Sequence, residues 1–282
     1  MNILFGTVIY NEGEEYLTDF FSSLAKQSDK SFQTIIVNEN VEHAERFFSD
    51  YPDLNGKIEI IQSEEHETPV EHRIRLIRES YNRKGDLLIL GDCDDSFSID
   101  RVCNTVSLFR EDNQAAFFYN QILDYYGEAI MPDLPAELDL VDCIMEHNFL
   151  GMSNTAINLR KLNAEFIESL NEYTASVFDW YFFSRLVLQI GYGRIIPQAR
   201  TYYRLYGGNI AGIRGYSSLN IEYEKSVKIK HYQMMRKYDH RYQALLDNMA
   251  KGHIDITKSI YNEKHFWWDL IKVKREGGNS EV

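Results

Sequence analysis

Residues 87–97 read LLILGDCDDSF, an apolar run that is followed by three aspartates within four positions. An uninterrupted apolar run that ends at a glycine is typical of a buried strand. Carboxylates a few ångströms apart raise one another's pKa and destabilise a fold, so three of them at a strand end require an explanation. The stretch therefore predicts a strand that enters the core and stops at an acidic site.

Strand-like runs alternate with helix-length segments through the first half of the chain. We expect strands at 3–10, 33–38, 57–61, 86–91 and 115–120, and helices at 13–27, 41–50, 68–84 and 99–112. This alternation favours an α/β fold with a doubly wound, mostly parallel sheet that has helices on both faces. Ligands of such sheets bind beyond the carboxyl ends of the strands, where the three aspartates fall.

The acidic cluster offers oxygen donors, which suit Mg²⁺ or Mn²⁺. Two other interpretations stay open: Asp95 or Ser96 could cap the helix expected from about Ile99, or the cluster could be a solvated turn. The familiar glycine-rich phosphate loops are missing from the sequence. Of the ways to bind a phosphate substrate, a diphosphate held through a metal ion is the one that remains.

Composition limits the class of protein. The chain has 282 residues, 44% of them hydrophobic, and a net charge of -13, which argues against nonspecific binding to nucleic acid. Neither a signal peptide nor a run of roughly 20 apolar residues is present, so a cytoplasmic protein is expected. Cys93, Cys103 and Cys143 lack a paired spacing and are interpreted as free thiols.

The end of the chain differs in charge from the rest. Residues 220–282 carry +3 and residues 1–219 carry -16. Helical spacing of apolar residues predicts one long amphipathic helix over 221–250. Residues 254–275 are expected to pack on the main domain as a helix. The alternative is a surface that lies on a membrane or a partner, which Trp267, Trp268 and the nearby basic residues favour.

Two later positions could complete an active site. Asp179 stands at the front of an apolar helical segment among aromatic residues, where it is either a first-turn acid or a general base. Arg204 lies among tyrosines before Gly207 and Gly208. It could pair with a phosphate under a closing loop, or simply stack on surface tyrosines.

Five segments in order resemble the inverting family 2 glycosyltransferases, whose catalytic domain has the GT-A fold. The first segment runs from TVIYNEGEEYL to FQTIIVNEN. The second is RIRLIRESYNRKGDLLILGDCDDSF with its Asp-x-Asp (DXD) signature, and the last three are NFLGMSNTAINLRKL, FDWYFFSRLVLQIGYG and YYRLYGGNIAG. The resemblance implies a catalytic domain over 1–215, with a nucleotide-sugar half at about 1–120 and an acceptor half at about 121–215. The catalytic domain would contain a mixed, mostly parallel sheet. A helical C-terminal extension, 216–282, would follow that domain in the chain.

The resemblance also implies roles for single residues. Asp94 and Asp92 would hold Mn²⁺ or Mg²⁺ at the donor diphosphate, and Asp179 would deprotonate the acceptor hydroxyl. The residues implied to contact the donor are Tyr10, Glu12, Glu39, Arg73, Asp92 and Arg204. The activity implied is hexosyl or deoxyhexosyl transfer from a UDP-, GDP- or dTDP-sugar to a saccharide or lipid-linked acceptor, in bacterial surface polysaccharide synthesis. Such an enzyme could work at the inner membrane face, held there through the extension, and as an oligomer.

Three positions depart from the family pattern. The chain has Asn-Glu-Asn at 38–40 where the family usually has Asp-Asp-Gly-Ser, Phe178 where an acid often precedes the base, and Tyr206 where a histidine is common. These departures motivate a second hypothesis, a glycosyltransferase-like subunit that binds without turnover. A nucleotidyltransferase is a third hypothesis, which the missing basic, glycine-rich loop disfavours.

Overall fold

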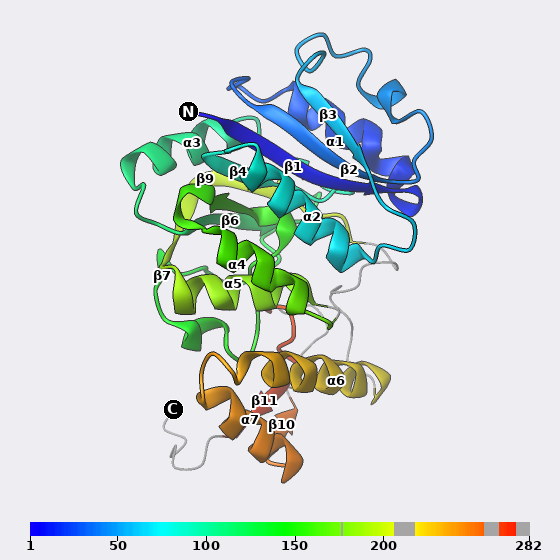
Figure 1. Ribbon diagram of the computed structural model, residues 1–282. Coiled ribbons are helices and arrows are strands. Elements are labelled where there is room, and N and C mark those ends of the chain that lie inside the picture. The colour runs from blue at the N-terminus through cyan, green and yellow to red at the C-terminus, as the bar shows by residue number, and fades with distance from the viewer. Residues whose placement is uncertain (176, 206–217, 257–264, 275–282) are drawn as a thin grey trace.

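The computed structural model describes residues 1–175, 177–205, 218–256 and 265–274 (Figure 1). The α-helices are α1 Leu17–Ala25, α2 Pro69–Asn82, α3 Arg101–Glu111, α4 Ala164–Ser169, α5 Phe178–Gln189, α6 Ser218–Met235 and α7 Arg241–Ala250. The strands are β1 Ile3–Tyr10, β2 Gln33–Glu39, β3 Ile58–Gln62, β4 Leu87–Leu90, β5 Ser96–Phe97, β6 Phe117–Leu123, β7 Glu137–Leu138, β8 Thr155–Asn158, β9 Gly193–Tyr202, β10 Ile254–Ile256 and β11 Ile271–Val273.

One large mixed sheet organises the molecule. Its strand order is β3-β2-β1-β4-β8-β6-β9-β5, and β7 also pairs with β9. Strands β1 to β4 are parallel, whereas β8 pairs antiparallel with both β4 and β6, which gives β6 and β9 the direction of β4. The α/β fold class and the mostly parallel sheet predicted from the sequence are therefore confirmed.

Strand β4 is buried on both faces, as its unbroken apolar run predicts. Leu88 and Leu90 belong to the core that contains Leu76 of α2. Leu87 and Ile89 face a second core, which α1 and α3 cover. Because helices close both faces, only the ends of this strand can reach solvent.

Two helix predictions in the first half need correction. Residues 41–50 contain no α-helix, only the 3-10 helix η2 Ala44–Phe47, which starts after His43 in the left-handed region. The expected helix 13–27 divides into the 3-10 helix η1 Asn11–Tyr16 and α1. The apolar spacing in these short segments indicates which side chains are buried. An irregular turn can bury the same side chains as an α-helix.

The long helix expected at 221–250 is wrong as one piece. It divides into α6 and α7, because the Asp239 carboxylate accepts the backbone N–H of Arg241 at 2.9 Å and stabilises a turn between them. The helical spacing of apolar residues continues from α6 into α7 because both helices bury apolar side chains against the same domain.

The described parts of the predicted helix 254–275, residues 254–256 and 265–274, pack on the main domain and contain no helix. They contribute β10 and β11, which pair antiparallel and have the alternating sequences IDI and IKV that suit strands. Trp267 and Trp268 are 9% and 8% exposed, and Trp267 exchanges backbone hydrogen bonds of 2.9 Å with Asn148. The tryptophans are thus part of the core.

The extension lies at the opposite end of the molecule from β3 (Figure 1). One hydrophobic core joins Val227, Tyr232 and Tyr242 of the extension to Trp180 of α5. Among the described residues, no helix is both long and apolar enough to cross a bilayer.

Candidate active site

The three aspartates form a turn at the carboxyl end of β4. Asp94 and Asp95 are 7% and 1% exposed, and Asp92 is partly exposed. Gly91 permits the turn, because a Cβ there would lie only 2.5 Å from Phe97 Cζ. We call residues 92–95 the acidic turn.

The acidic turn is not a helix cap. Ser96 and Phe97 form β5, which pairs with β9, and α3 starts only at Arg101 with Asp100 at its N-cap. The interpretation of Asp95 or Ser96 as the cap is therefore wrong. The pairing of β5 with β9 holds the acidic turn against the sheet.

Like charges crowd this turn. Burial raises the pKa of Asp92 to about 7; the charge of Arg73 opposes this rise, and those of Asp94 and Asp179 add to it. Burial, Asp94 and Asp92 also raise the pKa of Asp95 well above its usual value. Asp95 Oδ1 accepts the backbone N–H of Arg204 at 2.9 Å, whereas Oδ2 receives no hydrogen bond of good geometry from the described residues. A cation would relieve this repulsion.

A buried arginine lies behind the acidic turn, and the sequence analysis did not identify it. Arg101 is 1% exposed and donates to Leu90 O at 2.6 Å and to Asn120 Oδ1 at 3.1 Å. Burial lowers its pKa to about 9, while Asp95 and Asp92 raise it. In the sequence, Arg101 looks like an ordinary first-turn residue of a surface helix, so no local signal distinguishes it.

Asp179 lies in the first turn of α5, as predicted, and faces the acidic turn. It is partly exposed, and its Oδ1 accepts the N–H of Trp180 at 2.7 Å. Burial raises the pKa of Asp179, and the charge of Arg73 opposes that rise. Since Arg73 acts on both Asp92 and Asp179, the fold brings these three charged groups together from β4, α2 and α5.

Arg204 is bound by protein groups on several sides. Its guanidinium stacks 4.5 Å from the ring centroid of Tyr16 and 4.6 Å from that of Tyr125. Its Nε donates to Asp94 O at 3.0 Å and Nη2 to Asp19 Oδ2 at 2.8 Å. Arg204 thus stacks on tyrosines, as one of the two interpretations expected. That it binds a donor phosphate stays a prediction. Tyr206, Gly207 and Gly208 lie outside the described residues.

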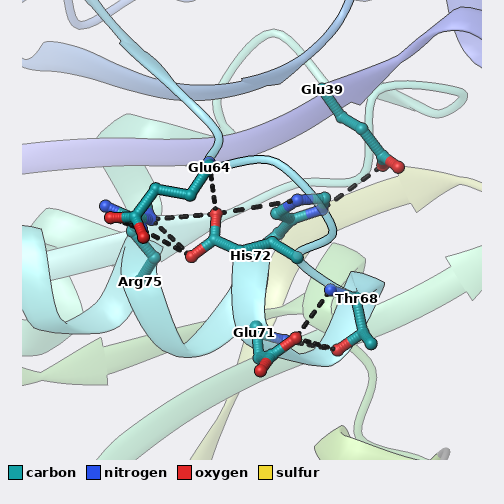
Figure 2. Close-up of polar contacts among 7 residues, drawn as sticks. Glu39, Glu64, Thr68, Glu71, His72 and Arg75 are labelled. Atoms are coloured by element: carbon teal, nitrogen blue, oxygen red, sulfur yellow. Dashed lines mark hydrogen bonds and ion pairs between the residues drawn. The ribbon is translucent and has the colours of Figure 1, made fainter.

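The other predicted donor contacts lie along the same strand ends. Tyr10 ends β1, and a Cβ built on the neighbouring Gly13 would lie 3.1 Å from its ring. Glu12 is exposed in η1. Glu39 ends β2 and is 34% exposed, with its Oε2 3.3 Å from His72 Nδ1 (Figure 2).

All three cysteines are free thiols, as predicted. Cys93 belongs to the acidic turn but is fully buried, and its Sγ would lie 3.0 Å from a Cβ at Gly13. Burial raises the pKa of the Cys93 thiol. A neutral thiol that packs in the core is unsuited to metal ligation.

The residues at the turn fit a divalent cation that a substrate helps to hold. Among the described residues, no three His, Cys, Asp or Glu side chains gather into a complete metal cluster. Mg²⁺ usually takes only one or two carboxylates and completes its shell with water and substrate phosphates. Asp92 and Asp94 would supply those carboxylates, and the repulsion among the aspartates that raises the pKa of Asp92 and Asp95 favours a bound cation.

Comparison with known proteins gives one family match. The sequence model described as "Glycosyl transferase family 2" matches residues 5–159. This range includes the acidic turn and ends before Asp179. No curated protein matches the sequence.

Three of the solved structures that are similar in fold illustrate the likeness. S. aureus TarS has a TM-score of 0.61 at 16% identity, with 88% of this chain and 43% of TarS covered. S. aureus TarS 1-349 in complex with UDP has a TM-score of 0.60 at 14% identity, with coverage of 89% and 72%. Mannosyltransferase PcManGT from Pyrobaculum calidifontis, in complex with GDP-Man and Mn²⁺, has a TM-score of 0.56 at 12% identity, with coverage of 84% and 64%. The chain thus spans less than half of TarS.

Proposed function

Because the chain belongs to glycosyl transferase family 2, we propose that it is a metal-dependent, inverting glycosyltransferase that uses a nucleoside-diphosphate sugar. The observation that carries this proposal is the electrostatic interaction of Arg73 with both Asp92, at the carboxyl end of β4, and Asp179, in the first turn of α5. UDP and GDP-Man with Mn²⁺ in the solved structures of similar fold support the choice of donor and metal.

The proposed reaction is one in-line displacement. The acceptor hydroxyl attacks the anomeric carbon, the bond from that carbon to the diphosphate oxygen breaks, and the hydroxyl proton passes to Asp179. A general base is most effective when its pKa lies near the working pH, and burial moves the pKa of Asp179 in that direction. Arg73, which acts on both carboxylates, would keep Asp179 ionised and attract the donor phosphates.

A divalent cation held by Asp92 and Asp94 would stabilise the charge of the departing diphosphate. The chain's own groups hold the backbone that carries this pair of carboxylates. Arg204 binds the Asp94 carbonyl and the Asp95 side chain, and Arg101 holds the last carbonyl of β4. Both arginines are therefore proposed to keep the acidic turn in place.

Two substitutions test the proposal. Asp179→Asn should reduce sugar transfer by about 10² to 10⁴-fold and leave nucleotide affinity unchanged, because it removes only the base. Asp94→Ala should abolish metal-dependent nucleotide binding. Isothermal titration with UDP and GDP in Mn²⁺, and hydrolysis or transfer assays over a panel of nucleotide-sugars, measure both effects. Full transfer by Asp179→Asn, or unchanged affinity in Asp94→Ala, would contradict the assignments.

The same experiments decide the alternative of an inactive binding subunit, which the departures at Phe178 and the 38–40 turn motivate. A wild-type chain that binds nucleotide but neither hydrolyses nor transfers any sugar of the panel would favour that alternative. Phe178 is buried in the core and stacks on Phe182, so this position serves packing.

The acceptor and the setting also belong to the proposal. We propose a saccharide or lipid-linked acceptor in bacterial surface polysaccharide synthesis, a hexosyl or deoxyhexosyl donor, and the domain division at about 215. Peripheral membrane contact would depend on the exposed Lys272 and Lys274, because Trp267 and Trp268 are buried. Partition of the Lys272→Glu variant between anionic liposomes and solution tests that contact.

A further inference from the structure

The C-terminal extension packs directly against the helix that carries the proposed base. Helix α6 lies next to α5, and both contribute to one hydrophobic core (Figure 1). Trp180 of α5 and His231 of α6 meet in this contact and are 0% and 1% exposed. Their ring centroids are 3.9 Å apart and their planes differ by 12°, so the two rings stack face to face. A residue of the extension therefore helps to set the position of the Trp180 ring.

His231 contributes a flat ring to this contact rather than a hydrogen bond. Neither of its ring nitrogens has a hydrogen-bond partner among the described residues. Burial lowers the pKa of His231 well below its usual value, and the charge of Lys228 lowers it further, so the ring is neutral. The Tyr242 ring of α7 lies 5.6 Å from His231 at 78°, an edge-to-face contact. His231 is thus held between the tyrosine of α7 and the tryptophan of α5.

Trp180 is linked to Asp179 by the chain and by a hydrogen bond. Its backbone N–H donates to Asp179 Oδ1 at 2.7 Å. Its indole N–H donates to the backbone oxygen of Ile144 in the 3-10 helix η3 Val141–Ile144. Because the indole is held both at its face and at its N–H, the first turn of α5 cannot rotate without losing one of these contacts. The contacts of Trp180 therefore fix the direction in which Asp179 points.

A side-chain cap does not fix the start of α5. Val177, at the N-cap, has an apolar side chain and makes no capping hydrogen bond. The extension also holds the helix further along. Tyr238, in the turn after α6, has its hydroxyl 3.2 Å from that of Tyr181, and its ring centroid lies 4.6 Å from the Arg185 guanidinium. Packing against the extension thus takes the place of a cap in orienting α5.

These contacts give the extension a part in the proposed reaction. A general base must lie within hydrogen-bond reach of the proton that it removes, and a displacement of about 1 Å can lower a rate by about 10²-fold. Resting on the function proposed above, we infer that His231 is a positioning residue, which holds Asp179 in place for the acceptor hydroxyl through the stacked ring of Trp180. The extension is then needed for the rate of sugar transfer and not for the binding of the donor.

A double-mutant cycle in the full chain tests this inference. The probe is the nucleotide-sugar of the panel that the wild type hydrolyses fastest in Mn²⁺, with water as the acceptor. His231→Ala should lower kcat by about tenfold or more at unchanged KM, because it misplaces the base and leaves the acidic turn intact. In the Asp179→Asn background the same substitution should have no further effect, since the base is already gone. A merely structural role would lower kcat by the same factor in both backgrounds.

Two control variants separate the stacked ring from general packing. His231→Phe keeps a flat ring against Trp180 and should keep the wild-type kcat, because the ring nitrogens have no hydrogen-bond partner among the described residues. Ile221→Ala is the matched control on the same helix. Ile221 is 7% exposed and packs in a separate cluster with Leu270 and Ile271. This variant should lose stability and keep kcat.

Full kcat in His231→Ala, or an equal loss with and without Asp179, would overturn the inference. A loss in His231→Phe as large as that in His231→Ala would also overturn it. If His231→Ala does not fold, His231→Leu, which fills the space without a flat ring, replaces it in the cycle, and the same outcomes decide. An active wild type with an unaffected His231 variant refutes this inference alone, whereas a wild type that hydrolyses and transfers no sugar of the panel refutes the proposed function.

Discussion

Two regions of the molecule bury charged side chains, and they differ in how those charges are matched. In the extension, Lys228 is fully buried and lies 3.6 Å from Glu224 Oε1. It also donates to the backbone oxygens of Glu146 and Ile271. Glu224 in turn accepts the N–H of Ile271 at 2.9 Å. We call Lys228, Glu224 and their partners the lysine cluster.

In the acidic turn the balance is different. Arg73 and Arg101 offset the charge of Asp92, and Arg101 also offsets that of Asp95. Burial raises the pKa of Asp92 and Asp95, as it raises that of Glu224, but neighbouring aspartates add to the rise in the acidic turn, whereas Lys228 opposes it at Glu224. The lysine cluster is complete within the chain and ties α6 to β11. The acidic turn is incomplete without a positive ligand. In this molecule, buried charges that are matched inside the chain stabilise the fold, whereas the unmatched ones mark the place for a ligand.

The largest expected effect tests the completeness of the lysine cluster. Lys228→Met should lower the free energy of unfolding by about 3–5 kcal/mol, because it leaves the buried Glu224 without its cation. Urea unfolding followed by circular dichroism measures this change. The double variant Lys228→Met/Glu224→Gln should be destabilised less, since both charges are gone. A loss below about 1 kcal/mol in the single variant would contradict the comparison.

A smaller effect is expected when a ligand completes the acidic turn. Saturation with Mn²⁺ and the preferred nucleoside diphosphate at about 100 times Kd should raise the free energy of unfolding by about 2.7 kcal/mol. Thermal unfolding with and without these ligands gives the change. Asp94→Ala should show no such gain. An equal gain in this variant would show that the ligands bind elsewhere.

The pH dependence of the ligand-free protein tests the unmatched charge directly. Asp92 has a pKa of about 7 in the folded state and about 4 when unfolded. The folded state therefore binds more protons between these values, and stability should fall as pH rises through this window. Asp92→Asn should remove about 2 kcal/mol of that fall between pH 5 and 7. Urea unfolding at both pH values measures the slope, and an unchanged slope would refute the pKa assignment.

The smallest effect is expected at a surface pair on the same helix as the lysine cluster. Lys225 Nζ lies 2.8 Å from Glu222 Oε1, and the carboxylate is 70% exposed. Lys225→Met should change the free energy of unfolding by less than about 0.5 kcal/mol, because water already solvates both groups. Chemical denaturation beside Lys228→Met measures the contrast. A loss as large as that of Lys228→Met would show that burial is not the cause.

Local patterns predicted the elements whose signal lies in neighbouring residues. The apolar run before Asp92 predicted β4, and the front of an aromatic helix located Asp179. The break at Asp239 and the strands β10 and β11 were not predicted. The apolar spacing of these segments fits a continuous helix as well as an irregular buried segment. Only their packing against the domain distinguishes the two.

Three features could be predicted from the residues alone: the α/β order of elements, the acidic turn at a strand end and the acid at the front of α5. These features follow from periodicity and from charges adjacent in the chain. Only the tertiary structure decided that Arg73 meets Asp92 and Asp179, that Arg101 lies beneath the turn and that His72 faces Glu39. Burial and the pairing of charges that are distant in the chain depend on which surfaces pack together. Local patterns of residues do not indicate which surfaces these are.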